Sequence, residues 1–139
     1  MTIESFIESL RKAIKEELGF SAFLLPQTAK STTAHIDLLY QDIVQSGENC
    51  MKLIFFADFK TGGTHTKWLT KTIALRKRLN GASDSYLSVP TSAGIFRAYW
   101  ISRGSPQWFY PDDESSMGAE YILPYKIEID IPERLFTED

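Results

Sequence analysis

Hydrophobic and polar residues alternate near the end of the chain, from Ala119 to Ile131. Successive side chains of a β-strand point to opposite faces, so this pattern predicts one long strand with an apolar face and a polar face. The polar face carries Lys126, Glu128 and Asp130, which indicates a sheet that is covered on one side only. Pro124 cannot donate a ladder hydrogen bond and therefore predicts a sheet edge or a bulge. The apolar face would consist of Tyr121, Leu123, Tyr125, Ile127, Ile129 and Ile131.

A helical period is found at the other end of the chain, from Ile3 to Leu18. Apolar residues recur there every three or four positions, as expected for an amphipathic helix that buries one face. Thr2 is a suitable N-cap, and Gly19 can adopt the left-handed conformation that ends a helix. The apolar positions are Ile3, Phe6, Ile7, Leu10, Ala13, Ile14 and Leu18.

A second helix is predicted to begin at Thr64 or Thr66, which would cap it, and to end near Leu79. Asn80-Gly81 follows as a typical stop signal. Its expected inner face consists of Trp68, Leu69, Thr72, Ile73, Leu75 and Leu79. Its expected outer surface carries basic residues and no acid, namely Lys67, Lys71, Arg76, Lys77 and Arg78.

Three further strands are predicted between these helices, at Phe20–Leu25, Ile36–Gln41 and Cys50–Phe59. Gly47-Glu48-Asn49 would form the turn between the second and the third. Residues 50–59 are almost continuously apolar, which is typical of a strand buried on both faces. We therefore place this strand in the middle of the sheet.

The region after the second helix is richer in small polar residues. Ala82–Ser92, which contains Pro90, is interpreted as a linker. Ile95–Ser102 and the aromatic segment Gln107–Tyr110 are predicted to be two strands joined as a hairpin. Pro111–Gly118 is predicted to be an exposed loop.

Together these elements predict an α+β fold. Its mixed, mostly antiparallel sheet would have about five or six strands, with two amphipathic helices packed on one face. A chain of 139 residues is long enough for one domain with its own core, so residues 1–139 are expected to form a single domain.

Composition and charge argue against several classes of protein. The net charge of −3 argues against nucleic acid as the main partner. Charged residues from Glu4 onward argue against a secretion signal, and the longest apolar run, Leu53–Ala57, is too short to cross a membrane. The single cysteine, Cys50, cannot form an internal disulfide, which fits a reducing compartment.

Candidate catalytic chemistry is sparse. Gly62-Gly63 before a helix could hold an anion, but no Lys follows as in a Walker motif. His65 could act as a general base, yet no nucleophile is identifiable beside it. The pattern predicts no catalytic residue, no metal site and no cofactor. One alternative is a small ligand-binding or hydrolytic α+β domain that uses the Gly62–His65 loop; another is a nucleic-acid module with Trp100 and Trp108 as stacking platforms.

Charge is distributed unevenly along the chain. Residues 52–103 contain nine basic and two acidic residues, a net charge of +7, whereas residues 112–139 contain nine acidic and two basic residues, a net charge of −7. Regions of opposite charge allow copies of a protein to associate head to tail, and such contacts can close into rings. The alternative is that both regions are simply solvated.

The layout resembles the small tail-terminator and tail-completion proteins of long-tailed phages and prophages. The shared features are the N-terminal helix, a central strand, a second helix before a long linker, and a closing strand with the sequence Tyr-Ile-Leu-Pro-Tyr-Lys-Ile-Glu-Ile. This resemblance implies an α+β structural protein without enzymatic activity. It also implies assembly into a ring, typically a hexamer, that stops tail-tube growth and joins the tail to the head connector.

The resemblance implies partners and a location as well. The expected partners are further copies of this chain, the phage tail-tube protein and the head–tail connector, with no membrane involved. The expected location is the bacterial host cytoplasm during assembly and then the tail or neck of the virion. The expected protein-interface residues are Lys67, Lys71 and Arg78 on the basic helix, and Asp112, Asp113 and Glu114 in the acidic loop.

Overall fold

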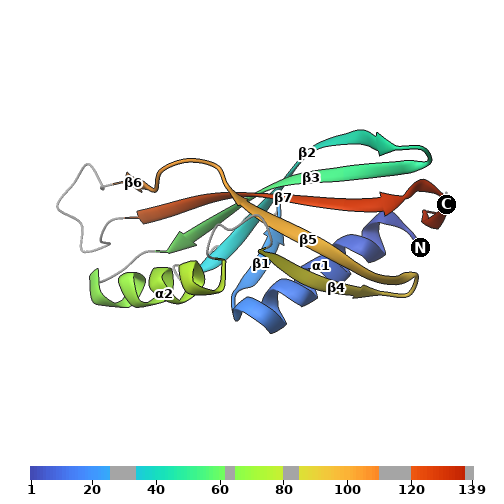
Figure 1. The fold of residues 1–139 in the computed structure, drawn as a ribbon. Coiled ribbons are helices and arrows are strands. Elements are labelled where there is room, and N and C mark those ends of the chain that lie inside the picture. The colour runs from blue at the N-terminus through green and yellow to red at the C-terminus, as the bar shows by residue number, and fades with distance from the viewer. Residues whose placement is uncertain (26–33, 62–64, 80–84, 110–119, 137–139) are drawn as a thin grey trace.

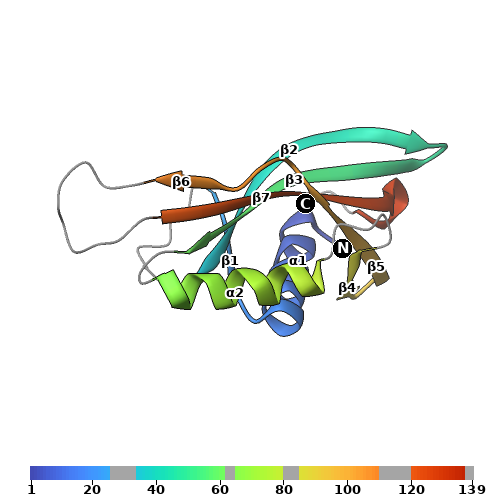
Figure 2. The same ribbon diagram turned by 60° about the vertical axis from the view of Figure 1, so that its left-hand side comes forward.

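The strands form one curled sheet with both helices on the same side of it (Figures 1 and 2). The computed structural model describes residues 1–25, 34–61, 65–79, 85–109 and 120–136. In chain order the elements are α1 (Ile3–Leu18), β1 (Ser21–Leu24), β2 (His35–Gly47), β3 (Cys50–Thr61), α2 (His65–Arg78), β4 (Tyr86–Thr91), β5 (Gly94–Ser102), β6 (Gln107–Phe109), β7 (Glu120–Pro132) and the 3-10 turn η1 (Glu133–Leu135).

The sheet has the order β1-β2-β3-β7-β5-β4, and the short β6 also pairs with β7. Among the described strands, β1 and β2 run parallel, and every other pair is antiparallel. The predicted α+β fold with a mixed, mostly antiparallel sheet is therefore confirmed. We call the side that faces the helices the inner face and the opposite side the outer face.

The long C-terminal strand is confirmed as β7, but the inference drawn from Pro124 is wrong. β7 lies between β3 and β5 and is not at an edge. The β5 ladder ends at the pair Ser102–Tyr125, and the β6 ladder begins at Gln107–Ile122. The Pro124 carbonyl oxygen accepts a hydrogen bond from the Arg103 N–H at 3.1 Å. In an antiparallel strand the backbone nitrogen and carbonyl of one residue point toward the same neighbouring strand. The Pro124 nitrogen, which has no hydrogen to donate, therefore faces the connection between β5 and β6, where no ladder hydrogen bond is needed.

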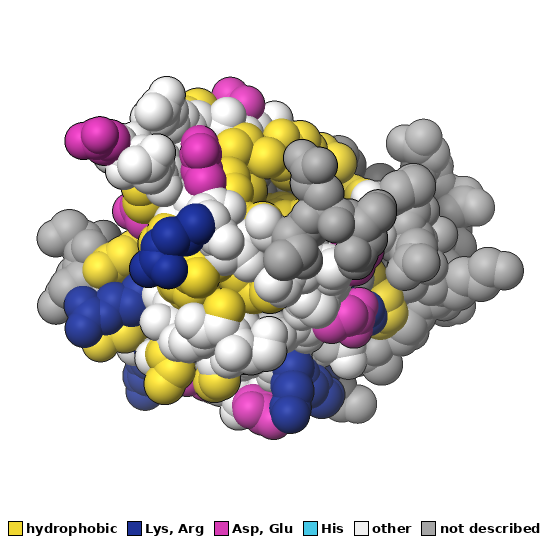
Figure 3. Space-filling model, turned by 90° about the vertical axis from the view of Figure 1, so that its right-hand side faces the viewer, with side chains coloured by type: hydrophobic (Ala, Val, Ile, Leu, Met, Phe, Trp, Pro, Cys, Tyr) yellow, Lys and Arg dark blue, Asp and Glu magenta, His cyan; other side chains and the backbone are white. Residues whose placement is uncertain are grey.

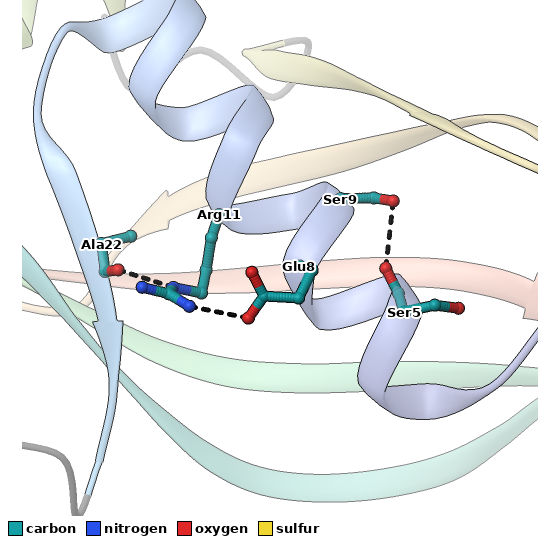
Figure 4. A network of polar contacts seen from close by, with 5 residues as sticks. All are labelled: Ser5, Glu8, Ser9, Arg11 and Ala22. Carbon is teal, nitrogen blue, oxygen red and sulfur yellow. Dashed lines mark hydrogen bonds and ion pairs between the residues drawn. The ribbon is translucent and has the colours of Figure 1, made fainter.

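The predicted caps of α1 are confirmed. The Thr2 hydroxyl accepts a hydrogen bond from the Ser5 N–H at 3.1 Å, and Gly19 has a φ of 81°, which favours glycine. Arg11 then ties the helix to β1, because its Nε donates to the Ala22 carbonyl oxygen at 2.8 Å (Figure 4). The Arg11 Nη1 also lies 2.7 Å from the Glu8 carboxylate. The buried residues of the helix are Phe6, Leu10, Ala13 and Ile14.

The second helix begins at His65, so Thr66 lies inside it, and Thr64 lies outside the described residues. Thr72, Leu75 and Leu79 are buried, as predicted. Ile73 was expected in the same inner face, but it is 46% exposed. Its side chain is about 100° around the helix axis from that of Thr72, which turns it away from the buried side. The side chains of residues 65–69 are not described.

The predicted linker at Ala82–Ser92 is wrong, because β4 occupies Tyr86–Thr91. Leu87 and Val89 are buried in alternation with Ser88, so the strand period was present in the sequence. Pro90 is compatible with this strand because β4 lies at the edge of the sheet.

The predicted hairpin between residues 95–102 and 107–110 is also wrong. β5 forms its hairpin with β4 through the pair Thr91–Gly94, whereas β6 pairs with β7. Tyr110 and the predicted loop Pro111–Gly118 lie outside the described residues. β5 and β6 are close in sequence but do not pair with each other, because both pair with β7, one after the other along the same edge.

The central position of β3, between β2 and β7, is confirmed. Its inner-face residues Leu53, Phe55, Ala57 and Phe59 are buried. Its outer-face residues, such as Phe56 and Asp58, are only half-buried, so the expected burial on both faces is wrong. The helices cover one face alone, which leaves the outer face open to polar side chains.

Candidate functional site

Two carboxylates face each other on the outer face of the sheet. Asp37 of β2 and Asp58 of β3 are direct partners in the antiparallel register, and His35 and Lys60 form a second such pair beside them. Opposed like charges destabilise a sheet unless other charges compensate for them. Asp37 is only 6% exposed, so this compensation is needed in a poorly solvated environment.

Basic side chains supply the compensation. The Lys60 Nζ lies 2.9 Å from Asp37 Oδ2, and the Arg103 Nη2 lies 3.0 Å from Asp58 Oδ1. The Arg103 guanidinium also stacks over the Phe56 ring, with its Cζ 3.6 Å from the ring centroid. His35 Nε2 lies 3.4 Å from Asp37 Oδ1, at a geometry that does not form a hydrogen bond. We call Asp37, Asp58, Lys60 and Arg103 the charge network.

Burial raises the pKa of the Asp58 carboxyl above its usual value. The positive charges of Arg103 and Lys60 lower this pKa, while the negative charge of Asp37 raises it further. The effect of burial is the largest, so desolvation of the charged form exceeds the attraction of the two cations. The ionised form of Asp58 is therefore less stable, relative to its protonated form, than that of an exposed aspartate.

The ion pairs of the charge network connect strands, which indicates a role in stabilising the sheet. Each carboxylate is held by a cation from a different part of the chain, which links β2 to β3 and β3 to the segment after β5. Within the described residues, no group of three or more His, Cys, Asp and Glu side chains is placed to hold a metal ion. The spacing of Asp37 and Asp58 along the sequence gives no sign of their pairing, since it depends on strand register.

The structure describes only some of the predicted interface residues. Lys71 is exposed on α2. Arg78 is engaged within the chain, because its Nη2 lies 3.0 Å from Glu17 Oε2 of α1. Lys67 belongs to α2, but its side chain is not described, and Asp112, Asp113 and Glu114 lie outside the described residues. The expected pairing of these basic residues with the acidic ones therefore stays a prediction.

The residues of the two alternative interpretations can be placed in part. Gly62 and Gly63 lie outside the described residues, and His65 begins α2 with its side chain not described. Trp100 is buried on the inner face, against the Tyr125 ring at 5.8 Å, so it cannot act as a base-stacking platform. Trp108 lies in β6, and its side chain is not described.

A hairpin projects from the sheet, because β2 is longer than the predicted strand Ile36–Gln41. β2 continues to Gly47 and turns through Glu48 and Asn49 into β3 (Figure 1). We call residues 39–49 the arm, and every one of them is exposed. Its large apolar residues are 37% to 50% exposed, namely Leu39, Tyr40, Ile43 and Val44. Figure 3 shows hydrophobic side chains at the top of this end of the molecule.

The arm also has an unpaired strand edge. β1 pairs only with His35–Leu38, so within the described residues β2 has no neighbour on that side from Leu39 onward. A bulge interrupts this edge between Tyr40 and Asp42, and the Ile43 N–H donates to the Asp42 carboxylate at 2.8 Å. Such features are typical of edges that avoid strand-to-strand aggregation.

A signal for the arm is present in the sequence. Ile43 and Val44 are adjacent, so in a strand they point to opposite faces. A sheet with helices on one side cannot bury both of them, and at least one must be exposed.

Comparisons with known proteins do not assign the chain to a family. No protein-family model matches the chain, and no curated protein sequence matches it. Among the described helices, none is long and apolar enough to cross a membrane.

Proposed function

We propose that this protein is a structural assembly protein of the phage tail-terminator type. In this role its copies form a ring, most simply a hexamer, that ends tail-tube growth and joins the tail to the head connector. Its partners are then other copies of itself, the tail-tube protein and the connector. It would act in the host cytoplasm during assembly and remain in the tail or neck of the virion.

The observation that carries the proposal is the arm. Four large apolar side chains are exposed on a projecting hairpin, on both of its faces. Proteins that assemble use exposed apolar side chains of this kind as contact surfaces. The resemblance in layout described above, together with the one-sided α+β sheet, supports the same class of protein.

Molar mass in solution tests the ring. We expect light scattering at several protein concentrations to reach a closed mass near six chains of 15.8 kDa and then to stop rising. Mass that grows without limit, or a monomer at every concentration, would contradict a self-assembled ring.

Tail length tests the biological role separately. Removing the gene from a phage that carries it should produce tubes of uncontrolled length in electron micrographs. Tails of normal length attached to heads would overturn the proposed function, whatever the oligomeric state of the purified protein.

A further inference from the structure

The arm has a restricted chemistry. Besides its four exposed apolar residues it carries two acids, Asp42 and Glu48, and no base. A surface that covers it should therefore be apolar at the centre and basic around it.

The exposed face of α2 has this complementary chemistry. Its sequence contains no acid, and its described part exposes two apolar residues and four bases, one of which, Arg78, is paired with Glu17 of α1. We call the exposed side around Ile73 the basic face; it consists of Ile73, Arg76 and Lys77, and both basic residues lie within about 60° of Ile73 around the helix axis. Ile73 is 46% exposed, so a surface that covers it would bury additional apolar area.

The two surfaces lie far apart in one molecule. The arm lies at one end of the sheet, and α2 lies beneath the sheet toward the other end (Figures 1 and 2). One copy cannot bring its own arm onto its own basic face. Two complementary surfaces at different places on one subunit produce a head-to-tail contact, which propagates until it closes into a ring or extends as a filament.

We propose that the arm of one copy docks on the basic face of α2 of the next copy. This inference rests on the proposed function, because it assigns the contact that builds the ring. Side chains of the arm make this contact. Its backbone edge is less suitable, because the bulge at Gln41 and the Asp42–Ile43 hydrogen bond interrupt the row of free donors and acceptors. Asp42 and Glu48 then lie against Arg76 and Lys77 of the neighbour.

The test begins with one variant of the arm. Ile43→Lys places a positive charge where the arm meets a basic surface, and we expect it to weaken assembly at least about tenfold. Ile95→Lys is the matched control, because Ile95 is also an exposed isoleucine of a hairpin and lies outside the arm. Circular dichroism should show both variants folded, since neither side chain is buried.

A second variant addresses the helix. Arg76→Glu combined with Lys77→Glu should weaken assembly to a similar extent. Its control is Lys12→Glu combined with Lys15→Glu on α1, which changes the net charge equally and also replaces a base in the last turn of a helix. Raising the salt concentration should weaken wild-type assembly, because the charges of both surfaces are exposed.

Mixing the two defective proteins provides the decisive measurement. The arm variant keeps an intact basic face, and the helix variant keeps an intact arm, so one good contact remains between them. Light scattering should show a 1:1 pair of two chains that grows no further. Failure of the mixture to form this pair, or normal assembly of the Ile43→Lys variant, would overturn the inference.

The outcomes separate this inference from the proposed function. A wild-type ring that is insensitive to the arm variant would overturn the arm–helix contact and leave the ring in place. A wild-type filament that is disrupted by both variants would support the contact and contradict the ring. A wild-type monomer at every concentration and low salt would overturn the arm–helix contact and the self-assembled ring, while tail length would still decide the biological role.

Discussion

Replacing Lys60 by methionine should destabilise the protein through the charge network. Methionine keeps an apolar side chain of similar length but removes the ammonium group that lies 2.9 Å from Asp37 Oδ2. The Asp37 side chain, 8% exposed, would lose this cation, while His35 would remain at 3.4 Å. A buried carboxylate that has lost its cation is costly, because water cannot replace the missing interaction.

The expected magnitude follows from the burial of the two partners. Removing one member of a fully buried ion pair costs about 3–5 kcal/mol. The Lys60 side chain retains 27% of its exposure, so solvent already screens part of this interaction. We therefore expect the free energy of unfolding to fall by about 2–3 kcal/mol, a large part of the roughly 5–15 kcal/mol typical of a domain.

Lys52→Met is the matched control. Lys52 lies on the same face of the same strand with a similar side-chain exposure of 31%, and its Nζ is 3.7 Å from the Glu128 carboxylate. Glu128 is more exposed than Asp37 and has a second cation, Lys126, at 3.1 Å. The loss from Lys52→Met should therefore stay within about 1 kcal/mol.

Urea unfolding followed by circular dichroism measures both variants, and an unchanged dependence on urea concentration indicates that the unfolded state is unaltered. Adding Asp37→Asn to Lys60→Met should recover part of the lost stability, because the unpaired charge disappears. A loss from Lys60→Met no larger than that from Lys52→Met would refute the argument from burial.

Three further predictions concern other parts of the chain. The folded-state pKa of Asp58 is raised, so its contribution to stability is present below the unfolded pKa and is lost as pH rises through the folded pKa. The stability of the wild type relative to Asp58→Asn should therefore fall with rising pH in that window, and a constant difference in urea titrations would contradict this. Ile127→Ala should cost about 2–5 kcal/mol because this β7 residue is fully buried, whereas Ile95→Ala at an exposed site should cost less than about 0.5 kcal/mol in the same assay. Thr2→Ala removes the acceptor for the Ser5 N–H and should lower the thermal midpoint by an amount equivalent to about 1 kcal/mol; an unchanged midpoint would show that the cap is dispensable.

The sequence alone determined the elements whose signal is local. The apolar period of α1 and its Thr2 and Gly19 ends depend on residues within one or two turns, and the structure confirms them. The alternation along β7 likewise identified the buried face, including Ile127 and Ile129. A one-sided sheet followed from the same alternation, because polar residues on every second position cannot be buried.

The candidate surfaces were predictable only in part. The excess of basic residues on α2 was visible in the sequence, and Lys71 is indeed exposed. The pairing of Arg78 with Glu17 was not visible, because these residues are 61 positions apart in the sequence and meet only through the packing of the two helices. The arm was not predicted, because Ile43 and Val44 are adjacent apolar residues and break the alternation that marked the predicted strand Ile36–Gln41.

Tertiary structure decided which strands become partners. Residues 107–109 pair with β7 and not with the nearer β5, and Pro124 occupies a central strand because its missing donor faces the gap between two ladders. Asp37 and Asp58 meet only because β2 and β3 adopt one register, and a shift of one residue would move either side chain to the other face. Periodicity is a property of neighbouring residues, whereas partner and register are set by the packing of the whole sheet.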